Sequence, residues 1–317
     1  MASSLSFSRV MLWSSLASVG VMACLLCCAT AAAETMSKAG QASANPYREF
    51  NEWVHTFIFP DAFVEGVYDK LGSNAGYYMV MYIRDFVAGS LLYYITGLAW
   101  HVCIYKLRRE TCFKPDAEMP TAEIIIDQIK LAQCSMTIYA GLPVLAEWLI
   151  EEGWTKVYYR IGDIGGWGMY ALWTAVYISF VEIGIYWMHR TLHTNKFLYK
   201  YVHALHHKYK KPAELTPWCS VSFNPLDGIL QACPYVICLF FVPCHYFTHI
   251  FLVFMTAVWA TNIHDALDGD SEPIMGSKYH TMHHTHYHVN FGQWFVFCDW
   301  YWGTLQDPKK RAVKKEA

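Results

Sequence analysis

Charge is the first thing that this sequence has little of. Only 16% of its 317 residues are charged, whereas a soluble globular chain carries about 25%. The formal net charge of −2 provides no attraction for a polyanion, so a nucleic-acid partner is not expected. Hydrophobic residues make up 55% of the chain and occur in long runs. This composition excludes a disordered or fibrous chain and predicts an integral membrane protein.

Three familiar sequence patterns are also missing. The 11 cysteines are scattered through apolar segments, apart from Cys24, Cys27 and Cys28, so we expect buried thiols rather than a disulfide framework or a cysteine-based zinc site. No glycine-rich fingerprint follows a strand, so a nicotinamide dinucleotide is not expected to bind this chain directly. The chain has no internal repeat, which argues against a transporter built from paired halves.

The N-terminal residues have the composition of a targeting segment. Residues 1–33 contain one base, Arg9, and no acid, and the apolar run from Val19 to Ala33 ends in small residues. This pattern predicts a signal peptide or signal anchor, with a transit peptide as the alternative. We expect residues 34–80 to form a polar, lumenal N-terminal segment and residues 81–317 to form the membrane domain.

Four apolar stretches are long enough to cross a bilayer, since a spanning helix needs about 20 mostly apolar residues. They are residues 86–105, 131–150, 164–187 and 229–263. The last stretch contains Pro234 and Pro243, and its length allows two short crossings or a hairpin that dips into the membrane and returns. The sequence therefore predicts an all-α bundle of about four or five transmembrane helices.

Basic residues are distributed asymmetrically around these stretches. Lys106, Arg108 and Arg109 follow the first stretch, and Glu151 and Glu152 follow the second. Because cytosolic loops carry an excess of lysine and arginine, we expect the first stretch to end in the cytosol and the second in the lumen. The alternation then puts the histidine-rich segments and the tail, KKRAVKKEA, in the cytosol. The tail resembles a di-lysine retrieval signal of the endoplasmic reticulum, with a solvated basic tail as the alternative.

Histidine is unusually abundant, with 15 residues in the chain. Three short strings, HRTLH, HALHH and HTMHH, hold eight of them. If each string is helical, the spacings of three and four residues turn its imidazoles toward one side, as metal ligands require. The predicted ligands are His189, His193, His203, His206, His207, His280, His283 and His284. Isolated histidines such as His55 and His101 are instead expected to be satisfied surface or interface residues.

Eight clustered histidines are too many for one zinc ion, which takes four ligands in a structural site and three plus water in a catalytic one. They suit two metal ions, and neutral imidazole binds zinc, copper, iron or nickel. His264 is a further candidate ligand. Asp265, which follows it, is a candidate partner for the far nitrogen of a ligating imidazole. Asp227 is expected to cap a turn or a helix start.

These strings resemble the motifs of the membrane fatty acid hydroxylase and sterol desaturase superfamily, H-x3-H, H-x2-HH and H-x2-HH. YWMHRTLH, KYVHALHHKY, FNPLDGILQ, NIHD and HTMHHTHYHVNFGQ are most similar to the plant-type Δ7-sterol C5(6)-desaturases, or lathosterol oxidases. The resemblance runs from about Tyr82 to Thr304 and is absent from the first 45 residues. Phe291 stands where a tyrosine is usual, which leaves substrate detail open but touches no proposed ligand.

The resemblance implies a reaction and its requirements. Two non-haem irons held by the eight histidines would use O2 to desaturate the C5–C6 bond of a Δ7-sterol, giving a 5,7-diene. Two electrons would come from NADH or NADPH through cytochrome b5 and its reductase. The family works in the endoplasmic reticulum membrane, with the metal site facing the cytosol and the substrate dissolved in membrane lipid. His264, and His245 in VPCHYFTH, stand where the family has further histidines.

Glu182 is an acid inside a predicted span, seven residues before His189 and on the same helix face. Acids inside membranes are costly and often functional. We expect Glu182 to orient a metal ligand or to contact the sterol 3-hydroxyl, with a structural hydrogen bond to another helix as the alternative.

Three other functions are compatible with parts of the pattern. A sterol C4-methyl oxidase or a fatty acid hydroxylase would share the irons but insert oxygen into its substrate. A metal transporter would place histidines near the bilayer midplane, whereas these strings follow the end of a span. A non-catalytic sterol sensor would have kept the fold, but the intact histidine strings argue against it.

Overall fold

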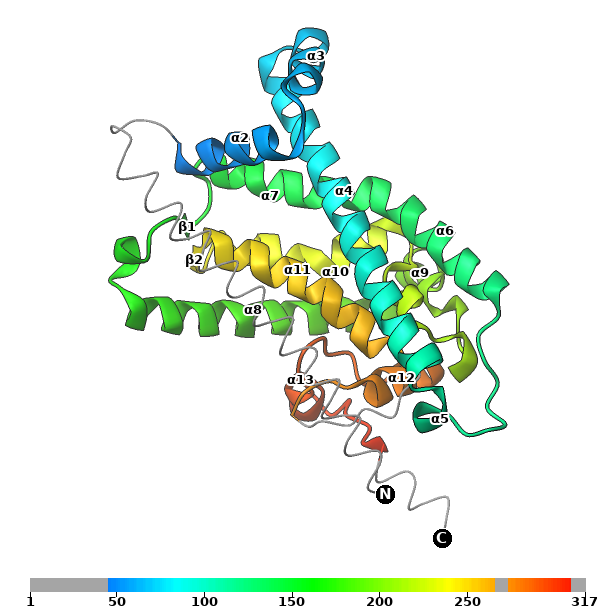
Figure 1. Ribbon diagram of the computed structural model, residues 1–317. Helices are drawn as coiled ribbons and strands as arrows, with labels where there is room; N and C mark the ends of the chain where they lie inside the picture. The colour runs from blue at the N-terminus through cyan, green and yellow to red at the C-terminus, as the bar shows by residue number, and fades with distance from the viewer. Residues whose placement is uncertain (1–44, 266–272, 309–317) are drawn as a thin grey trace.

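The computed structural model describes residues 45–265 and 273–308, which form a bundle of long helices (Figure 1). The expected targeting segment, residues 1–33, and the basic tail from residue 309 lie outside the described residues. The elements are α2 (Pro46–Ile58), α3 (Asp61–Leu71), α4 (Ser73–His101), η1 (Val102–Leu107), α5 (Arg109–Cys112), α6 (Ala122–Tyr139), α7 (Gly141–Glu151), β1 (Val157–Tyr158), η2 (Ile161–Ile164), α8 (Trp167–Thr194), α9 (Lys196–Leu198), η3 (Tyr199–His203), η4 (His206–Lys208), η5 (Pro212–Glu214), η6 (Pro217–Val221), α10 (Pro225–Cys238), β2 (Cys244–His245), α11 (Tyr246–Ile263), α12 (Ser277–His286) and α13 (Phe297–Tyr301).

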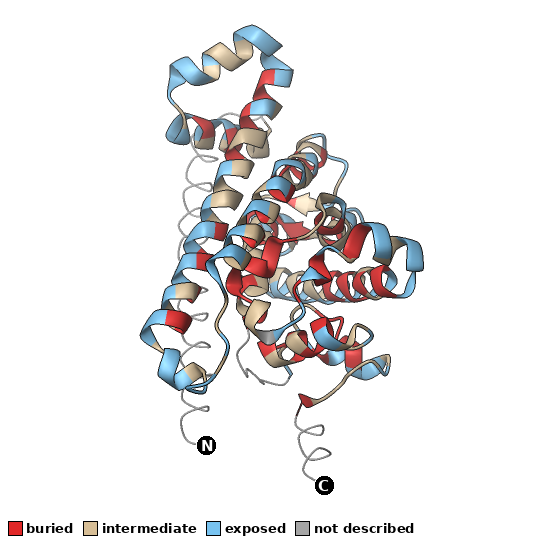
Figure 2. Cartoon of the chain, turned by 90° about the vertical axis from the view of Figure 1, so that its right-hand side faces the viewer, coloured by how far each residue is buried: buried red, intermediate tan, exposed pale blue. Residues whose placement is uncertain are grey.

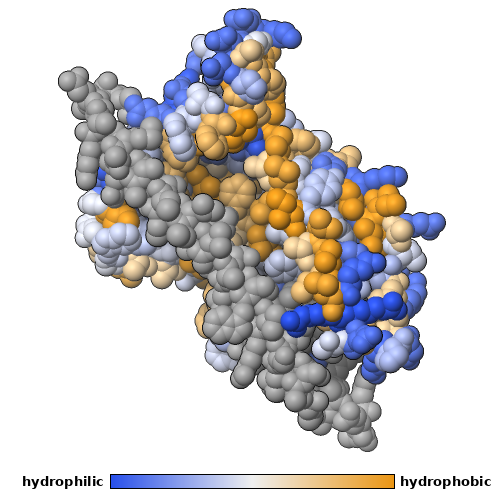
Figure 3. Space-filling model, viewed as in Figure 1, coloured by the Kyte–Doolittle hydropathy of each residue, from blue (hydrophilic) through white to orange (hydrophobic). Residues whose placement is uncertain are grey.

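Four segments are long and apolar enough to cross a membrane, which confirms the predicted all-α membrane bundle. They are Ser73–Leu107, Ala122–Glu151, Trp167–Thr194 and Tyr246–Ile263. On α4 the exposed side chains Val87, Leu91, Ile95 and Leu98 recur every three or four residues, so they share one face of the helix. Figure 3 shows hydrophobic side chains gathered along this part of the surface. We interpret this face as contacting lipid.

The first span begins at Ser73 rather than at residue 86 because two charges within it are compensated. Arg84 Nη2 lies 2.7 Å from both carboxylate oxygens of Glu147 on α7, and its Nη1 donates to Asn51 Oδ1 on α2 at 2.8 Å. The same guanidinium lies 2.8 Å from Asp85. A paired and hydrogen-bonded guanidinium can stay inside a helical bundle, so α4 continues through it.

The stretch with two prolines folds as two antiparallel helices of unequal length. The first, α10, has 14 residues with Pro234 inside it, and the second, α11, has 18. Only α11 reaches the length of a span. At the turn between them, β2 pairs in parallel with β1, and Val157 lies opposite Cys244. The turn lies at the opposite end of α11 from His264 and beside β1, which joins two other candidate spans, so of the two predicted alternatives the structure favours two crossings, the first of them short.

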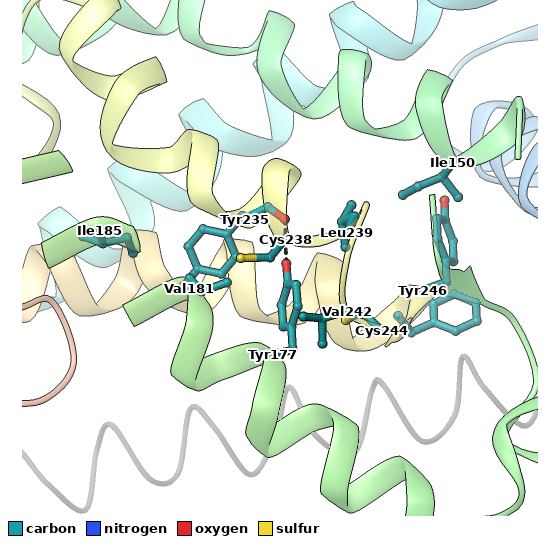
Figure 4. Packing of buried hydrophobic residues seen from close by; sticks show 11 residues of the cluster. Ile150, Tyr177, Val181, Ile185, Tyr235, Cys238, Leu239, Val242, Cys244 and Tyr246 are labelled. Atoms are coloured by element: carbon teal, nitrogen blue, oxygen red, sulfur yellow. Dashed lines mark hydrogen bonds between the residues drawn. The ribbon is translucent and has the colours of Figure 1, made fainter. Parts of the chain in front are cut away.

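The core of the bundle lies where α8, α10 and α11 meet. Figure 4 shows Tyr177 and Val181 of α8 beside Tyr235 and Cys238 of α10, and the Tyr177 hydroxyl donates to the Tyr235 carbonyl at 2.9 Å. Figure 2 shows that the buried residues follow the inward sides of the helices. At Gly184 a Cβ would come within 2.8 Å of Pro234 Cβ, so glycine lets α8 and α10 approach closely.

The predicted burial of the cysteines holds for four of the eight in the described residues, whereas Cys134 is exposed and the other three are partly buried. Among the described residues all cysteines are free thiols, and Cys219, Cys238, Cys244 and Cys298 are buried. They pack as small hydrophobic side chains.

Candidate metal centre

The three histidine strings come together from three parts of the chain. His189 and His193 occupy the last turns of α8, one helical turn apart, and the third string lies within α12. Figure 1 shows α12 beside the ends of α8 and α11. The second string is not α-helical. His203 ends the π turn η3, and His206 and His207 lie in the 3-10 turn η4. The predicted convergence holds, but the second string achieves it through irregular turns.

The ligand nitrogens form two groups, and within each group all lie within 4.8 Å of one another. Every member is buried. The first group is His189, His193, His203, His207 and His283, and the second is His206, His264, His280 and His284. The eight predicted histidines and His264 are therefore all brought together, in two adjacent groups.

The spacing of the nitrogens suits metal ligation better than hydrogen bonding. In the first group the Nε2 atoms of His193 and His203 are 2.8 Å apart, and each is 3.1 Å from His207 Nε2. Each nitrogen is either a donor or an acceptor, so three nitrogens in mutual contact cannot form three hydrogen bonds. Three lone pairs can instead converge on one cation. Bonds of about 2.1 Å at right angles would separate such nitrogens by about 3.0 Å.

The second group has the same spacing. His264 Nε2 lies 3.2 Å from His206 Nε2 and 2.9 Å from His280 Nε2, and His280 Nε2 lies 3.2 Å from His284 Nε2. The ligand nitrogens therefore fit two metal ions, one in each group, in agreement with the number predicted from the sequence.

Hydrogen bonds on the far side of the rings fix several imidazoles with Nε2 as the ligand atom. The Nδ1 of His189 donates to the Phe291 carbonyl at 3.0 Å, and that of His283 donates to the Val289 carbonyl at 2.8 Å. Among the described residues the Nε2 atoms of both have no hydrogen-bond partner. A neutral imidazole that donates from Nδ1 keeps its lone pair on Nε2, which is the form that binds a metal.

Burial favours the neutral form of six histidines that lie outside the spans. It lowers the pKa of His264 to about 4 and that of His283 to about 3. Burial and the neighbouring histidines hold the pKa values of the following four well below the usual range: His206, His207, His280 and His284. Near neutral pH these imidazoles therefore have the unprotonated form that a metal needs.

An apolar cavity of about 200 Å³ opens beside the two groups. Its lining includes four of the histidines, His189, His206, His264 and His280. From there it extends along α11 between α4, α7 and α10, past side chains such as Val253. A cavity with metal ligands at one end and apolar walls suits a long apolar substrate.

The comparisons with known proteins agree with this geometry. Residues 174–304, which contain all three strings, match the family model described as fatty acid hydroxylase. The Δ7-sterol-C5(6)-desaturase of Nicotiana tabacum is 46% identical over 234 residues, which is 74% of this chain and 86% of that protein. The chain belongs to the fatty acid hydroxylase and sterol desaturase family.

More distant members of the family match over less of their length. Lathosterol oxidase of Rattus norvegicus is 36% identical over 179 residues, 54% of this chain and 58% of that protein. A Δ7-sterol 5(6)-desaturase of Leptosphaeria maculans is 32% identical over 235 residues, 71% of this chain and 64% of that protein. No solved structure matches the chain.

His245 is not brought to the metal centre. It lies at the start of α11, whereas His264 follows the end of that helix, so about 27 Å of helix separates them. Its Nε2 lies 3.0 Å from the Tyr159 carbonyl. The resemblance to the family suggested a ligand here, but His245 belongs to β2, which pairs with β1 and holds the imidazole at the opposite end of the bundle.

Asp227 is a carboxylate that lies behind one of the histidines. Asp227 is fully buried, and its Oδ2 accepts from His203 Nδ1 at 2.8 Å. Asn224 caps α10 instead, since its side chain accepts from the Leu226 amide. Asp265 is buried too, but the Nδ1 of His264 donates to the Ala260 carbonyl at 2.6 Å. The sequence contained a clue to this role of Asp227. In FNPLDG the asparagine can cap the helix, which leaves the side chain of the aspartate free to accept a hydrogen bond from a histidine.

Glu182 holds a loop that follows the third string. Its carboxylate accepts hydrogen bonds from the backbone amides of Gln293, Trp294 and Phe295, at 3.0–3.1 Å. The neighbouring residue Phe291 holds His189 through its carbonyl. Glu182 thus makes structural hydrogen bonds, to a loop rather than to another helix, and it reaches the metal centre through that loop.

Proposed function

We propose that this protein desaturates the C5–C6 bond of a Δ7-sterol to give a 5,7-diene sterol. The observation that carries the proposal is the pair of buried histidine groups at the end of an apolar cavity in a membrane bundle. The names of the similar plant, animal and fungal proteins support the sterol and the position of the double bond.

The proposed metals are two non-haem irons, held by the two histidine groups described above. When bound, the irons would activate O2 to remove hydrogen from unactivated carbon, which side chains alone cannot do. The balance is two hydrogens from the sterol, two electrons and two protons against one O2, giving two waters. We propose that NADH or NADPH supplies the electrons through cytochrome b5 and its reductase, since the sequence has no dinucleotide fingerprint.

The residues of the chain itself would bind, orient and exclude water. Asp227 and the carbonyls of Phe291, Val289 and Ala260 orient imidazoles from behind, and such partners also raise the basicity of a ligand. The apolar walls of the cavity exclude water from the reacting carbons. Glu182 acts at a distance by holding the loop that carries Gln293.

The proposed location is the endoplasmic reticulum membrane, with the metal site and the C-terminus in the cytosol. The basic segment after the first span and the acidic residues after the second support this orientation. Residues 1–33 as a signal peptide or anchor remain part of the proposal, and the boundary between the lumenal segment, expected at 34–80, and the catalytic domain, expected at 81–317, moves to Ser73, where the first span begins.

Expression in a cell that lacks its own C5-desaturase tests the function. Conjugated 5,7-dienes absorb ultraviolet light that Δ7-sterols do not, so we expect the diene in extracted sterols. His206→Ala should abolish it, whereas His286→Ala should not, because His286 is on α12 but belongs to neither histidine group. Accumulation of Δ7-sterol despite good expression would refute the proposal, and a product with added oxygen would indicate a C4-methyl oxidase or hydroxylase.

A further inference from the structure

Two buried hydroxyls face the cavity beside the metal ligands. Thr261 lies on α11 one turn before His264, and Ser220 faces it from η6; both line the cavity. Their exposed fractions are 1% and 3%. Thr261 Oγ1 lies 3.3 Å from Ser220 Oγ and 3.2 Å from the Ala257 carbonyl. The two hydroxyls thus form a polar spot in an otherwise apolar part of the wall.

This pair has hydrogen-bonding capacity to spare. Thr261 donates toward Ser220 or toward the Ala257 carbonyl. Among the described residues Ser220 Oγ receives a hydrogen bond but gives its own proton to no acceptor. A buried hydroxyl that leaves its donor unused is unfavourable. A ligand hydroxyl placed between the two side chains would accept from Ser220 and donate to Thr261.

The position of the pair matters because of the chemistry of a sterol. The C5 atom is two bonds from C3, which bears the hydroxyl, and the fused rings are rigid. The hydroxyl therefore stays close to the reacting carbons in every binding mode. A side chain that binds it must lie next to the metal ligands, and not at the far end of the cavity.

Other polar side chains on the same helix are too far away. Along α11, Thr256 and His249 also line the cavity. They precede His264 by eight and fifteen residues, or about 12 and 22 Å at 1.5 Å per residue. Thr261 precedes it by three residues, or about 4.5 Å. Of these three side chains, only Thr261 lies close enough to the metal centre.

We propose that Ser220 and Thr261 bind the 3-hydroxyl of the sterol substrate. The sterol then lies along α11 with its hydroxyl end at the metal centre, and its alkyl tail points past Val253 and Ile250. The inference rests on the proposed function, because oxidation at the C5–C6 bond requires the 3-hydroxyl to lie at this end of the cavity.

The test compares a Δ7-sterol with its 3-deoxy analogue in the wild type, Ser220→Ala and Thr261→Val. We expect the wild type to prefer the hydroxylated sterol in kcat/KM by about 10- to 100-fold, as for a buried polar group left unpaired. The ratio of the kcat/KM values for the hydroxylated and the deoxy sterol should fall toward one in both variants, because neither variant loses a contact to the deoxy analogue. Ser179→Ala is the control, since Ser179 is exposed on α8 and bonds only within its own helix.

A binding measurement on the intact protein, made without an electron donor, separates the two proposals. A fluorescent 3-hydroxysterol and its deoxy analogue are titrated into each variant, and the same loss of preference is expected without any turnover. If the wild type makes no diene but binding discriminates, the proposed function fails and the hydroxyl site stands. If a variant binds both ligands more weakly by the same factor, the hydroxyl site is overturned. It is also overturned if Ser220→Ala keeps the preference for the hydroxysterol and Gln293→Ala loses it. Thr261→Ser, which keeps the hydroxyl, should retain the preference if Thr261→Val does not fold.

Discussion

The carboxylate of Asp227 lies 2.8 Å from the Nδ1 of His203, and both side chains are completely buried. His203 Nε2 in turn faces the nitrogens of His193 and His207. A carboxylate on α10 is thereby linked through one imidazole to the first histidine group. This arrangement fixes the ring and directs its lone pair to the metal position.

Replacing Asp227 with asparagine should weaken the metal centre while leaving the fold intact. The amide keeps the shape of the side chain but loses its negative charge. We expect metal affinity or activity to fall by about 10- to 100-fold, as is typical for partners behind metal ligands. Elemental analysis of the purified protein measures the metal content. Asp61→Asn, in the exposed first turn of α3, is the control, and an unchanged metal content in Asp227→Asn would contradict the role.

Removing the metals should destabilise the whole bundle. The histidine groups join α8, the segment from η3 to η4, the end of α11, and α12, so two bound ions together would crosslink four parts of the chain, and each ion would crosslink three of them. The ions bind the folded chain, whereas the unfolded chain has no assembled metal site. Their binding free energy therefore adds to the stability of the fold. We expect a chelator to lower Tm in detergent and iron to restore it. An unchanged Tm after proven metal loss would exclude this crosslinking.

Glu182→Gln should release the loop at residues 293–295. A glutamine has one acceptor oxygen, and its amide group would face backbone donors that now point at a carboxylate. We expect a loss of about 1–3 kcal/mol in stability, together with a lower metal content, since Phe291 in the same segment holds His189. Thermal unfolding and elemental analysis measure the two effects. Full metal content and full turnover in this variant would show that the loop does not depend on the carboxylate.

The sequence predicted the chemistry of the centre better than its surroundings. Histidine spacing identified eight of the nine members of the two groups, because ligands on one side of a short segment leave a periodic signal, whereas His264 stood alone as a further candidate. The partners behind the rings were harder. The carbonyls of Phe291 and Val289 leave no trace in residue type, and Asp227 is remote in sequence from His203. These contacts depend on how irregular segments pack.

Helix boundaries illustrate a second limit. The charges at Arg84 and Asp85 marked the start of the first span in the sequence, yet the helix continues through them. Arg84 pairs with Glu147, which is 63 residues away, and Asp85 pairs with Arg84 itself. Local hydropathy cannot register a pairing over that distance, so the predicted span began too late.

The pair formed by Arg84 and Glu147 should stabilise the bundle only as a pair. Breaking a buried ion pair leaves one charge uncompensated and costs about 3–5 kcal/mol. We therefore expect Arg84→Met to lower Tm strongly, because it leaves the carboxylates of Glu147 and Asp85 without their cation, and Arg84→Met combined with Asp85→Asn and Glu147→Leu to recover much of the loss. The exposed pair Arg48–Glu52 is the control, and Glu52→Ala should cost no more than about 0.5 kcal/mol. Equal effects at both pairs would contradict the importance of burial.

His55 should make the protein less stable in acid. It was expected at a satisfied surface or interface, but it is buried, and among the described residues neither ring nitrogen has a hydrogen-bond partner. Burial, helped by the nearby Arg84 guanidinium, lowers its pKa to about 4. An unfolded histidine titrates near 6.5. Between these values the unfolded chain binds a proton that the folded chain does not, so stability falls as the pH falls.

The size of this effect can be isolated with one substitution. Each pH unit below about 6.5 should cost the wild type about 1.4 kcal/mol at this site, until the pH approaches 4. His55→Phe retains an aromatic ring next to Tyr77, whose ring centroid is 5.4 Å from that of His55, and it cannot take up a proton. We expect the Tm of the variant to fall less steeply than that of the wild type between pH 6.5 and 4.5, while the two differ little in slope above pH 7. Parallel curves across the whole range would mean that the folded protein protonates His55 as readily as the unfolded chain does.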